Sequence, residues 1–291
     1  MAIPEWASAR RSLDAYELSG KKALIVGAAR GAGRAIALAL AEAGADLALC
    51  TTTTAGDESV ALRKVAREVR EMGRAAIEQS IDASLGTGAQ VMVKQVLKDL
   101  GRIDVLVNAP DAFVAKPATR ISDADWAKAI GGNLGATFFT CRAVGREMLK
   151  QGTRNMEQGT GEGQGSGVKG HGAMTGGRII NVASVLGERG LANASAYCAA
   201  QAGILNLTRA LAQEWARDGI TVNAIALGWM EDAAALGDTS PEANQTVRFI
   251  PMKRAGRADE VGPLAVYLAS DASAYVTGQV LFIDGGLTVH L

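Results

Sequence analysis

The segment that decides the fold reads Val26-Gly27-Ala28-Ala29-Arg30-Gly31-Ala32-Gly33-Arg34. It follows a short apolar run and leads into a stretch with apolar residues at three- and four-residue spacing. A strand, a glycine-rich turn and a helix in this order are typical of a dinucleotide-binding unit. Glycine permits the tight turn and lets backbone amides approach a pyrophosphate. We therefore predict cofactor contacts at Gly27, Gly31, Ala32 and Gly33; a glycine turn without a ligand is the alternative.

Apolar runs and helical patterns alternate along the rest of the chain. The runs lie at residues 23–26, 46–50, 105–108, 178–182, 221–226 and 281–283. The stretches with helical spacing include residues 33–43, 60–72, 89–100 and 202–217. Apolar strands separated by helices predict a parallel sheet that is covered on both faces. We expect a single doubly wound α/β domain, Rossmann-like, over residues 21–291.

Two segments fall outside this alternation. Residues 1–20 precede the first strand and are expected to form an N-terminal extension. Residues 151–177 are rich in glycine and polar residues, which predicts a flexible surface loop. A phosphate-binding loop is the alternative, but no strand precedes the segment and no Gly-Lys-Ser/Thr sequence ends it. Because the segment joins a helix to a strand, we place it at the edge opposite the ligand crevice.

The composition disfavours several classes of function. Thirty basic and thirty acidic residues give a formal net charge of zero, which argues against nucleic acid as a partner. Three cysteines without ligand spacing and only two histidines give little support to a metal site or a Ser-His-Asp triad. No apolar stretch is long enough to cross a membrane, and charges interrupt any signal-peptide pattern. We expect a cytoplasmic protein with a small-molecule substrate and with no metal, membrane or nucleic-acid partner.

These motifs resemble the short-chain dehydrogenase/reductase family over almost the whole chain. The spacing of the glycines at residues 27–33 is the family's fingerprint. Asn133, Ser184 and Tyr197 match three catalytic positions of the family in the expected order. The fourth position, which the family fills with lysine, is Gln201. The resemblance implies hydride transfer between a nicotinamide cofactor and a carbonyl compound, in which Ser184 binds the carbonyl oxygen and Tyr197 exchanges its proton.

The glutamine at position 201 changes the chemistry that the resemblance implies. Residues four apart on a helix share one face, so a lysine there would lower the pKa of Tyr197 and hold the cofactor ribose. Gln201 has no charge, so we expect the pKa of Tyr197 to lie near its ordinary value of about 10. Reduction needs a neutral acid and should suffer less than oxidation. Gln201 could still hydrogen-bond the ribose, or it could be an exposed helix residue.

Other cofactor positions match the family only in part. The family's Asn-Asn-Ala-Gly appears as Asn108-Ala109-Pro110-Asp111, and the resemblance implies cofactor contacts at Asn108 and Ala109. Asp82 matches the aspartate that meets the adenine in relatives. Gly228 matches the glycine of a Pro-Gly pair, and Asp232 replaces a threonine that meets the carboxamide or pyrophosphate. A carboxylate near a pyrophosphate is unfavourable unless it turns away.

The end of the second strand bears on the choice between NAD and NADP. A carboxylate there would bind the ribose hydroxyls of NAD, but the chain has Thr51 followed by three more threonines. Neutral hydroxyls tolerate a 2′-phosphate, and Arg30 could pair with it. These residues favour NADP(H) over NAD(H). The alternative for Arg30 is a solvated loop charge.

The sequence thus predicts an NADP-preferring carbonyl reductase that lacks the catalytic lysine. Two alternatives stay open: a non-redox enzyme of lyase or dehydratase type, and a catalytically silent ligand-binding subunit. Residues 229–255 are expected to cover the substrate pocket as a lid. Four residues should make that pocket apolar: Leu186, Leu191, Trp229 and Met230. The chain's end, at residues 274–286, matches the family's last strand and its contacts, which implies a homotetramer.

Overall fold

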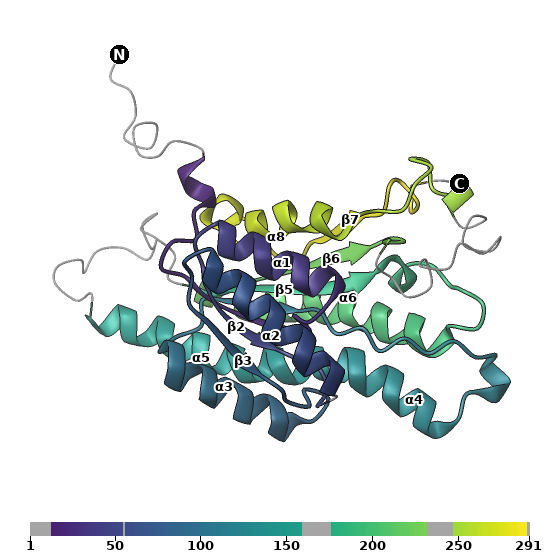
Figure 1. Cartoon of the computed structure of the whole chain (residues 1–291), viewed down its shortest axis with the longest axis horizontal. Coiled ribbons are helices and arrows are strands. Elements are labelled where there is room, and N and C mark those ends of the chain that lie inside the picture. Colours follow the sequence, from purple (N-terminus) through teal and green to yellow (C-terminus); the bar gives the residue numbers. More distant parts are fainter. Residues whose placement is uncertain (1–12, 55, 159–175, 232–246, 290–291) are drawn as a thin grey trace, which may run out of the picture.

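The centre of the molecule is a parallel sheet of seven strands (Figure 1). The computed structural model describes residues 13–54, 56–158, 176–231 and 247–289. The strand order is β3-β2-β1-β4-β5-β6-β7, and each neighbouring pair is parallel. The strands are β1 (Lys22–Val26), β2 (Asp46–Cys50), β3 (Ala76–Gln79), β4 (Val105–Asn108), β5 (Arg178–Ser184), β6 (Thr221–Leu227) and β7 (Val280–Ile283). The predicted Rossmann-like sheet is confirmed.

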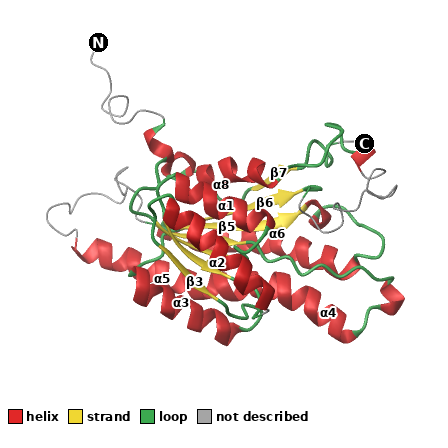
Figure 2. Ribbon diagram, viewed as in Figure 1, coloured by secondary structure: helices red, strands yellow, loops and turns green. Residues whose placement is uncertain are grey.

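Helices cover both faces of this sheet (Figure 2). They are α1 (Gly31–Glu42), α2 (Gly56–Glu71), α3 (Gly86–Leu100), α4 (Asp123–Ile130), α5 (Ala136–Gln158), α6 (Ser195–Trp215) and α8 (Gly262–Ala269). Ala23 and Ile25 of β1 pack into the core beneath α1, α2 and α8, whereas Leu24 and Val26 pack on the opposite side with α3 and α5. A strand that is buried on both faces must be apolar throughout, which explains the unbroken apolar runs in the sequence.

The sequence analysis missed one strand and misplaced the end of one helix. β3 ends in Glu78 and Gln79 and lies at the sheet edge, so it presents no apolar run. α5 continues to Gln158, so the loop predicted from residue 151 is wrong as far as residue 158. Residues 159–175 of that insert and residues 1–12 of the predicted N-terminal extension lie outside the described residues. Leu18, near the end of that extension, is fully buried and belongs to the core around α1.

The strand order reverses next to β1, and this reversal defines where a ligand can bind. From β1 the chain moves outward to β3, and it then returns to β4 on the other side of β1 and continues to β7. In such sheets the ligand crevice lies outside the carboxyl ends of the strands at the point of reversal. The glycine turn after β1 and the loop after β4 both start at this edge. Within the described part of the chain, no helix combines the length and apolar character needed to span a membrane.

Candidate active site

Two glycines allow close backbone approaches beside β1. Gly27 has a φ of +87°, and a Cβ atom added there would lie 2.2 Å from the carbonyl oxygen of Ala109. A Cβ atom at Gly33 would lie 2.1 Å from the carbonyl oxygen of Gly27. No other residue type fits either position without a shift of the backbone. The turn after β1 and the loop after β4 are therefore in direct contact through Gly27 and Ala109.

The start of α1 offers backbone amides and a cation. Gly31 and Ala32 open the helix, and Arg30 before them makes no side-chain cap. The first amides of the helix can therefore bind an anion, so this turn fits a pyrophosphate. Arg30 forms an ion pair with Asp57 in the first turn of α2, and both side chains are exposed, so Arg30 is a solvated charge with an acidic partner. The hydrogen bond from Arg30 lowers the pKa of Asp57.

The residues that follow β2 and β3 make local hydrogen bonds. Thr51 is fully buried, and its hydroxyl donates to the carbonyl oxygen of Thr53 at 2.5 Å. That hydroxyl also accepts from the amide of Ile81 at 3.3 Å, so local hydrogen bonds hold it in the turn after β2, and the cofactor contact at Thr51 stays a prediction. Asp82 Oδ1 accepts from the amide and the hydroxyl of Ser84 at 2.9 and 2.6 Å. The turn after β3 therefore orients the Asp82 carboxylate.

Asn133 lies in a π-helical turn, residues Gly131–Gly135, between α4 and α5. Such turns interrupt regular helices and are frequent at functional sites. The Asn133 side chain is fully buried, and its amide oxygen accepts from the backbone amide of Ala112 at 3.0 Å. Its amide nitrogen donates to the carbonyl oxygens of Ala112 at 3.0 Å and Ala129 at 2.8 Å. Asn133 thus holds the loop after β4 in place through hydrogen bonds to both the backbone amide and the carbonyl oxygen of Ala112.

Tyr197, in the first turn of α6, makes the most informative contact of the site. Its hydroxyl donates to Oδ1 of Asp111 at 2.9 Å, and its ring meets the ring of Phe113 edge-on with 5.0 Å between the centroids. Burial raises the pKa of Tyr197 well above 10, the Asp111 carboxylate raises it further, and a hydrogen bond with Ser184 opposes these effects. The expectation of a pKa near 10 is therefore wrong.

Asp111 was not assigned a role from the sequence. The family's motif has a glycine at this position, which carries no side chain. The carboxylate of Asp111 in its place was the feature of the sequence that could have pointed to a role. Asp111 as a residue is exposed, but its carboxyl group faces Tyr197 among protein atoms. This burial raises the pKa of Asp111, and the hydrogen bond from Tyr197 partly offsets the rise.

Gln201 supports Ser184 instead of replacing the missing cation. Its side chain is 1% exposed, so its interpretation as an exposed helix residue is wrong. The amide oxygen of Gln201 accepts from the backbone amide of Ser184 at 3.0 Å, so only the amide nitrogen is left for a ribose. The Ser184 hydroxyl, at the end of β5, accepts from the amide of Leu186 at 3.2 Å. Gln201 therefore positions Ser184, the predicted catalytic serine, through the Ser184 backbone amide.

Asn108 belongs to a buried chain of hydrogen bonds beneath the site. Its amide oxygen accepts from Thr140 of α5 at 2.6 Å, and its amide nitrogen donates to Asn181 of β5 at 3.0 Å. Asn181 in turn donates to Thr208 of α6 at 2.9 Å. The Asn108 side chain therefore joins β4 to its neighbours, and the expected cofactor contact could use only its backbone.

The predicted apolar pocket is present only in part. Leu186 and Trp229 pack in one cluster with Tyr197, together with Ile250. Met230 packs instead in the core around α1, and Leu191 is 41% exposed, so neither belongs to this cluster. Cofactor contacts were also predicted at Gly228 and Asp232. Gly228 passes so close to β7 that an added Cβ atom would lie 2.7 Å from Asp284 Cα, and Asp232 lies outside the described residues.

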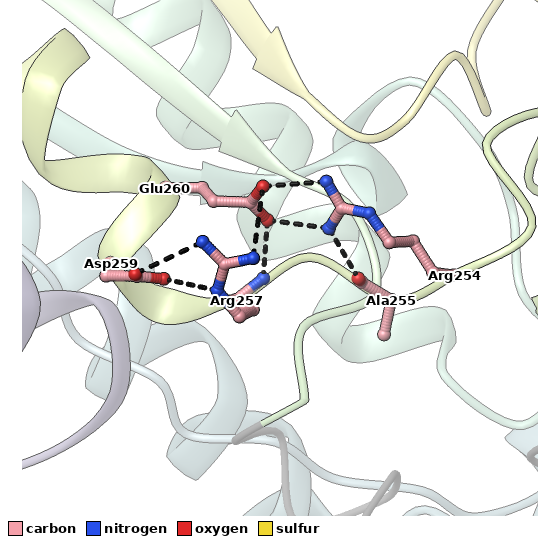
Figure 3. Close-up of polar contacts among 5 residues, drawn as sticks. All are labelled: Arg254, Ala255, Arg257, Asp259 and Glu260. Carbon is pink, nitrogen blue, oxygen red and sulfur yellow. Dashed lines mark hydrogen bonds and ion pairs between the residues drawn. The ribbon is translucent and has the colours of Figure 1, made fainter.

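The two described ends of the predicted lid are joined. The carbonyl oxygen of Trp229 accepts a hydrogen bond from the backbone amide of Gly256 at 2.9 Å. The backbone amide of Glu231 donates to the carbonyl oxygen of Gly256 at 2.8 Å. Residues on both sides of Gly256 form an ion-pair cluster (Figure 3). In it Arg254 contacts both carboxylate oxygens of Glu260 at 2.7 and 2.8 Å, which lowers the pKa of Glu260 to about 2. These contacts hold the two described ends of the predicted lid together, and residues 232–246 of it lie outside the described residues.

Two family models match the chain, and together they cover most of its length. One, described as short chain dehydrogenase, matches residues 21–156. The other, described as Enoyl-(Acyl carrier protein) reductase, matches residues 167–288. This chain belongs to the short-chain dehydrogenase/reductase family. The resemblance inferred from the motifs is therefore confirmed.

Similar proteins in this family cover nearly the whole chain. The 2-dehydro-3-deoxy-D-gluconate 5-dehydrogenase of Pseudoalteromonas atlantica is 35% identical over 276 residues, which are 94% of this chain and 98% of that protein. The D-threitol dehydrogenase of Mycolicibacterium smegmatis is 33% identical, with 94% and 95% covered. A gluconate 5-dehydrogenase from Burkholderia cenocepacia, crystallised with NADP and tartrate, superposes with a TM-score of 0.82 at 30% identity, with 97% and 100% covered. The chain is a nicotinamide-dependent short-chain oxidoreductase.

Proposed function

We propose that this short-chain oxidoreductase reduces a small carbonyl compound and prefers NADPH. The proposal is carried by Ser184 and Tyr197, which lie at the same strand edge as the glycine turn before α1. A bound nicotinamide supplies the hydride. Ser184 donates a hydrogen bond to the carbonyl oxygen, and Tyr197 donates its proton to the same oxygen. Because its pKa is raised, Tyr197 stays protonated at neutral pH, as reduction requires.

The missing cation at position 201 supports reduction as the preferred direction. A lysine would favour tyrosinate, which is the form that oxidation needs. Gln201 instead keeps the Ser184 backbone in place through its amide oxygen. It therefore acts as a positioning residue, and the protonated state of Tyr197 is left to burial and to Asp111.

The preference for NADPH rests on three observations. β2 ends without a carboxylate, Arg30 lies at the start of α1, and the related Burkholderia cenocepacia structure holds NADP. Arg30 is engaged by Asp57, so a 2′-phosphate would have to replace that carboxylate. An Arg–phosphate contact is charge-assisted and bidentate, and it can compete with one exposed ion pair.

The substrate is expected to be uncharged near its reacting carbonyl. The groups around Tyr197 are the Asp111 carboxyl, the neutral Ser184 and the apolar side chains of Leu186 and Trp229. A substrate carboxylate close to Asp111 would meet like charge whenever Asp111 is ionised. Of the relatives named above, the D-threitol dehydrogenase has the name that fits this expectation, since threitol carries hydroxyl groups and no acid.

The proposal also includes a homotetrameric assembly and a cytoplasmic location. β7 is an edge strand with half-buried side chains, and Tyr275 just before it is fully exposed, as expected of a surface that pairs with a second copy in a homotetramer. Cys50 and Cys141 are buried free thiols, which fits a reducing compartment such as the cytoplasm. Light scattering coupled to size exclusion would test the assembly.

The decisive experiment measures turnover against a matched set of substrates. NADPH and NADH consumption are followed with short ketoses and with keto acids of equal chain length, using the parent and Tyr197→Phe. We expect NADPH-dependent reduction of the uncharged ketoses, and we expect Tyr197→Phe to lower it by about 10²-fold or more while NADPH still binds. Turnover that Tyr197→Phe leaves unchanged, or no turnover with any carbonyl compound, would contradict the proposal.

A further inference from the structure

Asp111 is a carboxylate at a position where the fold requires no side chain. It follows β4 in the loop that contacts the glycine turn, and its Oδ1 atom accepts from the Tyr197 hydroxyl at 2.9 Å. The titratable groups that face this hydroxyl are Asp111, from the loop, and Cys198, on the same helix. Ser184, from β5, and Gln201, from α6, are neutral. Within the described residues, the groups that act on Tyr197 therefore include an acid and no base.

The loop that carries Asp111 is held in place by other side chains. Asn133 binds both the amide and the carbonyl oxygen of Ala112, the next residue along the chain. Phe113, one residue further, packs edge-on against the Tyr197 ring. Lys116 donates its amide to the carbonyl oxygen of Asn193 at 2.7 Å, just before α6 begins. The loop is thus tied on both sides of Asp111, so the carboxyl group is directed at Tyr197 by the surrounding structure.

We propose that Asp111 is the proton partner of Tyr197, and that its carboxyl group supplies and removes the proton of the Tyr197 hydroxyl. The inference rests on the proposed function, since it describes how Tyr197 is supplied with protons. Asp111 is suited to the exchange because it is exposed as a residue and bonded to the buried hydroxyl at the same time. It can therefore pass protons between solvent and the interior of the site.

The exchange balances in both directions. In reduction, hydride reaches the carbonyl carbon, the O–H bond of Tyr197 breaks, and its proton goes to the substrate oxygen. Tyr197 then takes the proton of the Asp111 carboxylic acid, and Asp111 is reprotonated from water. In oxidation the alcohol carbon gives up its hydride to the bound nicotinamide, the alcohol proton passes to Tyr197, the Tyr197 proton passes to the Asp111 carboxylate, and Asp111 releases that proton to water.

The direction of the pH dependence follows from these steps. Donation from Tyr197 while Asp111 is ionised would leave two negative charges side by side, which is unfavourable. Reduction should therefore fall as pH rises through the pKa of Asp111, which burial raises above 3.8. Oxidation needs the carboxylate and should rise through the same pH range. Control by Tyr197 alone would instead put the change near or above pH 10.

The test uses the full-length chain with three variants. Asp111→Asn keeps a side chain of equal size but cannot exchange a proton, and Asp111→Gly introduces the family's residue. Asp123→Asn, on the first turn of α4, removes one acid elsewhere as a matched control. Tyrosine ionisation is followed by ¹³C NMR of labelled tyrosine, with Tyr197→Phe to assign the signal among the four tyrosines. Rates of reduction and oxidation are measured against pH in parallel, and thermal melting checks the fold.

Each outcome has one meaning. We expect Asp111→Asn to lower the pKa of Tyr197 and to move the pH midpoint of both reactions to alkaline values, while Asp123→Asn changes neither. An unchanged tyrosine titration in Asp111→Asn would overturn the inference whether or not the protein turns over. An unchanged pH midpoint in an active Asp111→Asn protein would also overturn it. If the titration moves but no variant is active, the pairing stands and the proposed function fails.

Discussion

The turn after β1 and the loop after β4 flank the same crevice, but they act by different means. The turn after β1 acts through its backbone, since Gly27 and Gly33 leave no room for a Cβ atom. The loop after β4 acts through a side chain, since the carboxyl group of Asp111 contacts Tyr197. A site made of backbone geometry must keep its glycines for the fold to form. A site made of side chains can change its charge while the fold stays the same.

The largest effect is expected from adding a side chain to the turn after β1, which acts through its backbone. Gly27→Ala or Gly33→Ala would force a Cβ atom to within 2.2 or 2.1 Å of a carbonyl oxygen. We expect a loss of about 2–4 kcal/mol in the free energy of unfolding. NADPH affinity should fall by about tenfold or more, because the same shift displaces the first turn of α1. Urea unfolding and fluorescence titration with NADPH measure the two effects.

Gly31→Ala is the matched control for this prediction. Gly31 has a φ of +51°, but a Cβ atom added there meets no atom within 4 Å. The cost should be limited to the left-handed backbone conformation, about 1 kcal/mol. If Gly31→Ala destabilised the protein as much as Gly27→Ala, close approach would not be the reason for the motif.

A second prediction concerns Gln201, where a lysine would restore the positive charge that the family has beside Tyr197. Gln201→Lys should lower the pKa of Tyr197 and increase oxidation at neutral pH, by about tenfold for each unit of pKa lost. It should also destabilise the fold by about 1–3 kcal/mol, because the Ser184 amide loses its acceptor inside the protein. Oxidation rates against pH and thermal melting measure the two effects together.

Gln201→Met is the control that separates the effect of the added charge from the effect of losing the hydrogen bond to Ser184. Methionine has a similar length, no charge and only a weak acceptor, so it should lower stability without a gain in oxidation. Equal oxidation by the lysine and methionine variants would mean that the cation at this position does not act on Tyr197.

The same difference explains what could be predicted from the sequence. The six apolar strands and the glycine turn were predictable, because burial on two faces and close backbone approach permit few residue types. β3 was missed because Glu78 and Gln79 lie on an edge strand. The roles of Gln201 and Asp111 were not predictable, since they depend on which side chains meet across 17 and 86 residues of chain. The spacing of residues along the sequence does not specify which distant side chains come into contact.

A third prediction concerns Arg30, the residue proposed to bind the 2′-phosphate of NADPH. Asp57→Asn should free Arg30 from its ion pair and remove a carboxylate from the neighbourhood of a 2′-phosphate. NADPH affinity should rise by about two- to fivefold, because exposed ion pairs are weak, and NADH affinity should stay the same. Calorimetric titration at low and high salt measures this, with Arg30→Gln as the reverse change. Equal gains for both cofactors would show that Asp57 does not compete for Arg30.

The smallest expected effect lies outside the turn after β1 and the loop after β4, in the ion-pair cluster on both sides of Gly256. Arg254 holds the pKa of Glu260 at about 2, below the ordinary value of 4.5. A lowered pKa means that the pair stabilises the fold above pH 4.5 and that this contribution is lost as pH falls toward 2. Glu260→Gln should therefore lower the melting temperature at pH 7 by no more than about 3 °C, because the pair is exposed. The difference between parent and variant should shrink between pH 4.5 and 2 and should also shrink in high salt. The titration of Tyr197 and the affinity for NADPH should be equal in both proteins. A change in either would mean that the cluster acts on Tyr197 or on the cofactor site, and the turn after β1 and the loop after β4 could then no longer be treated as independent of it.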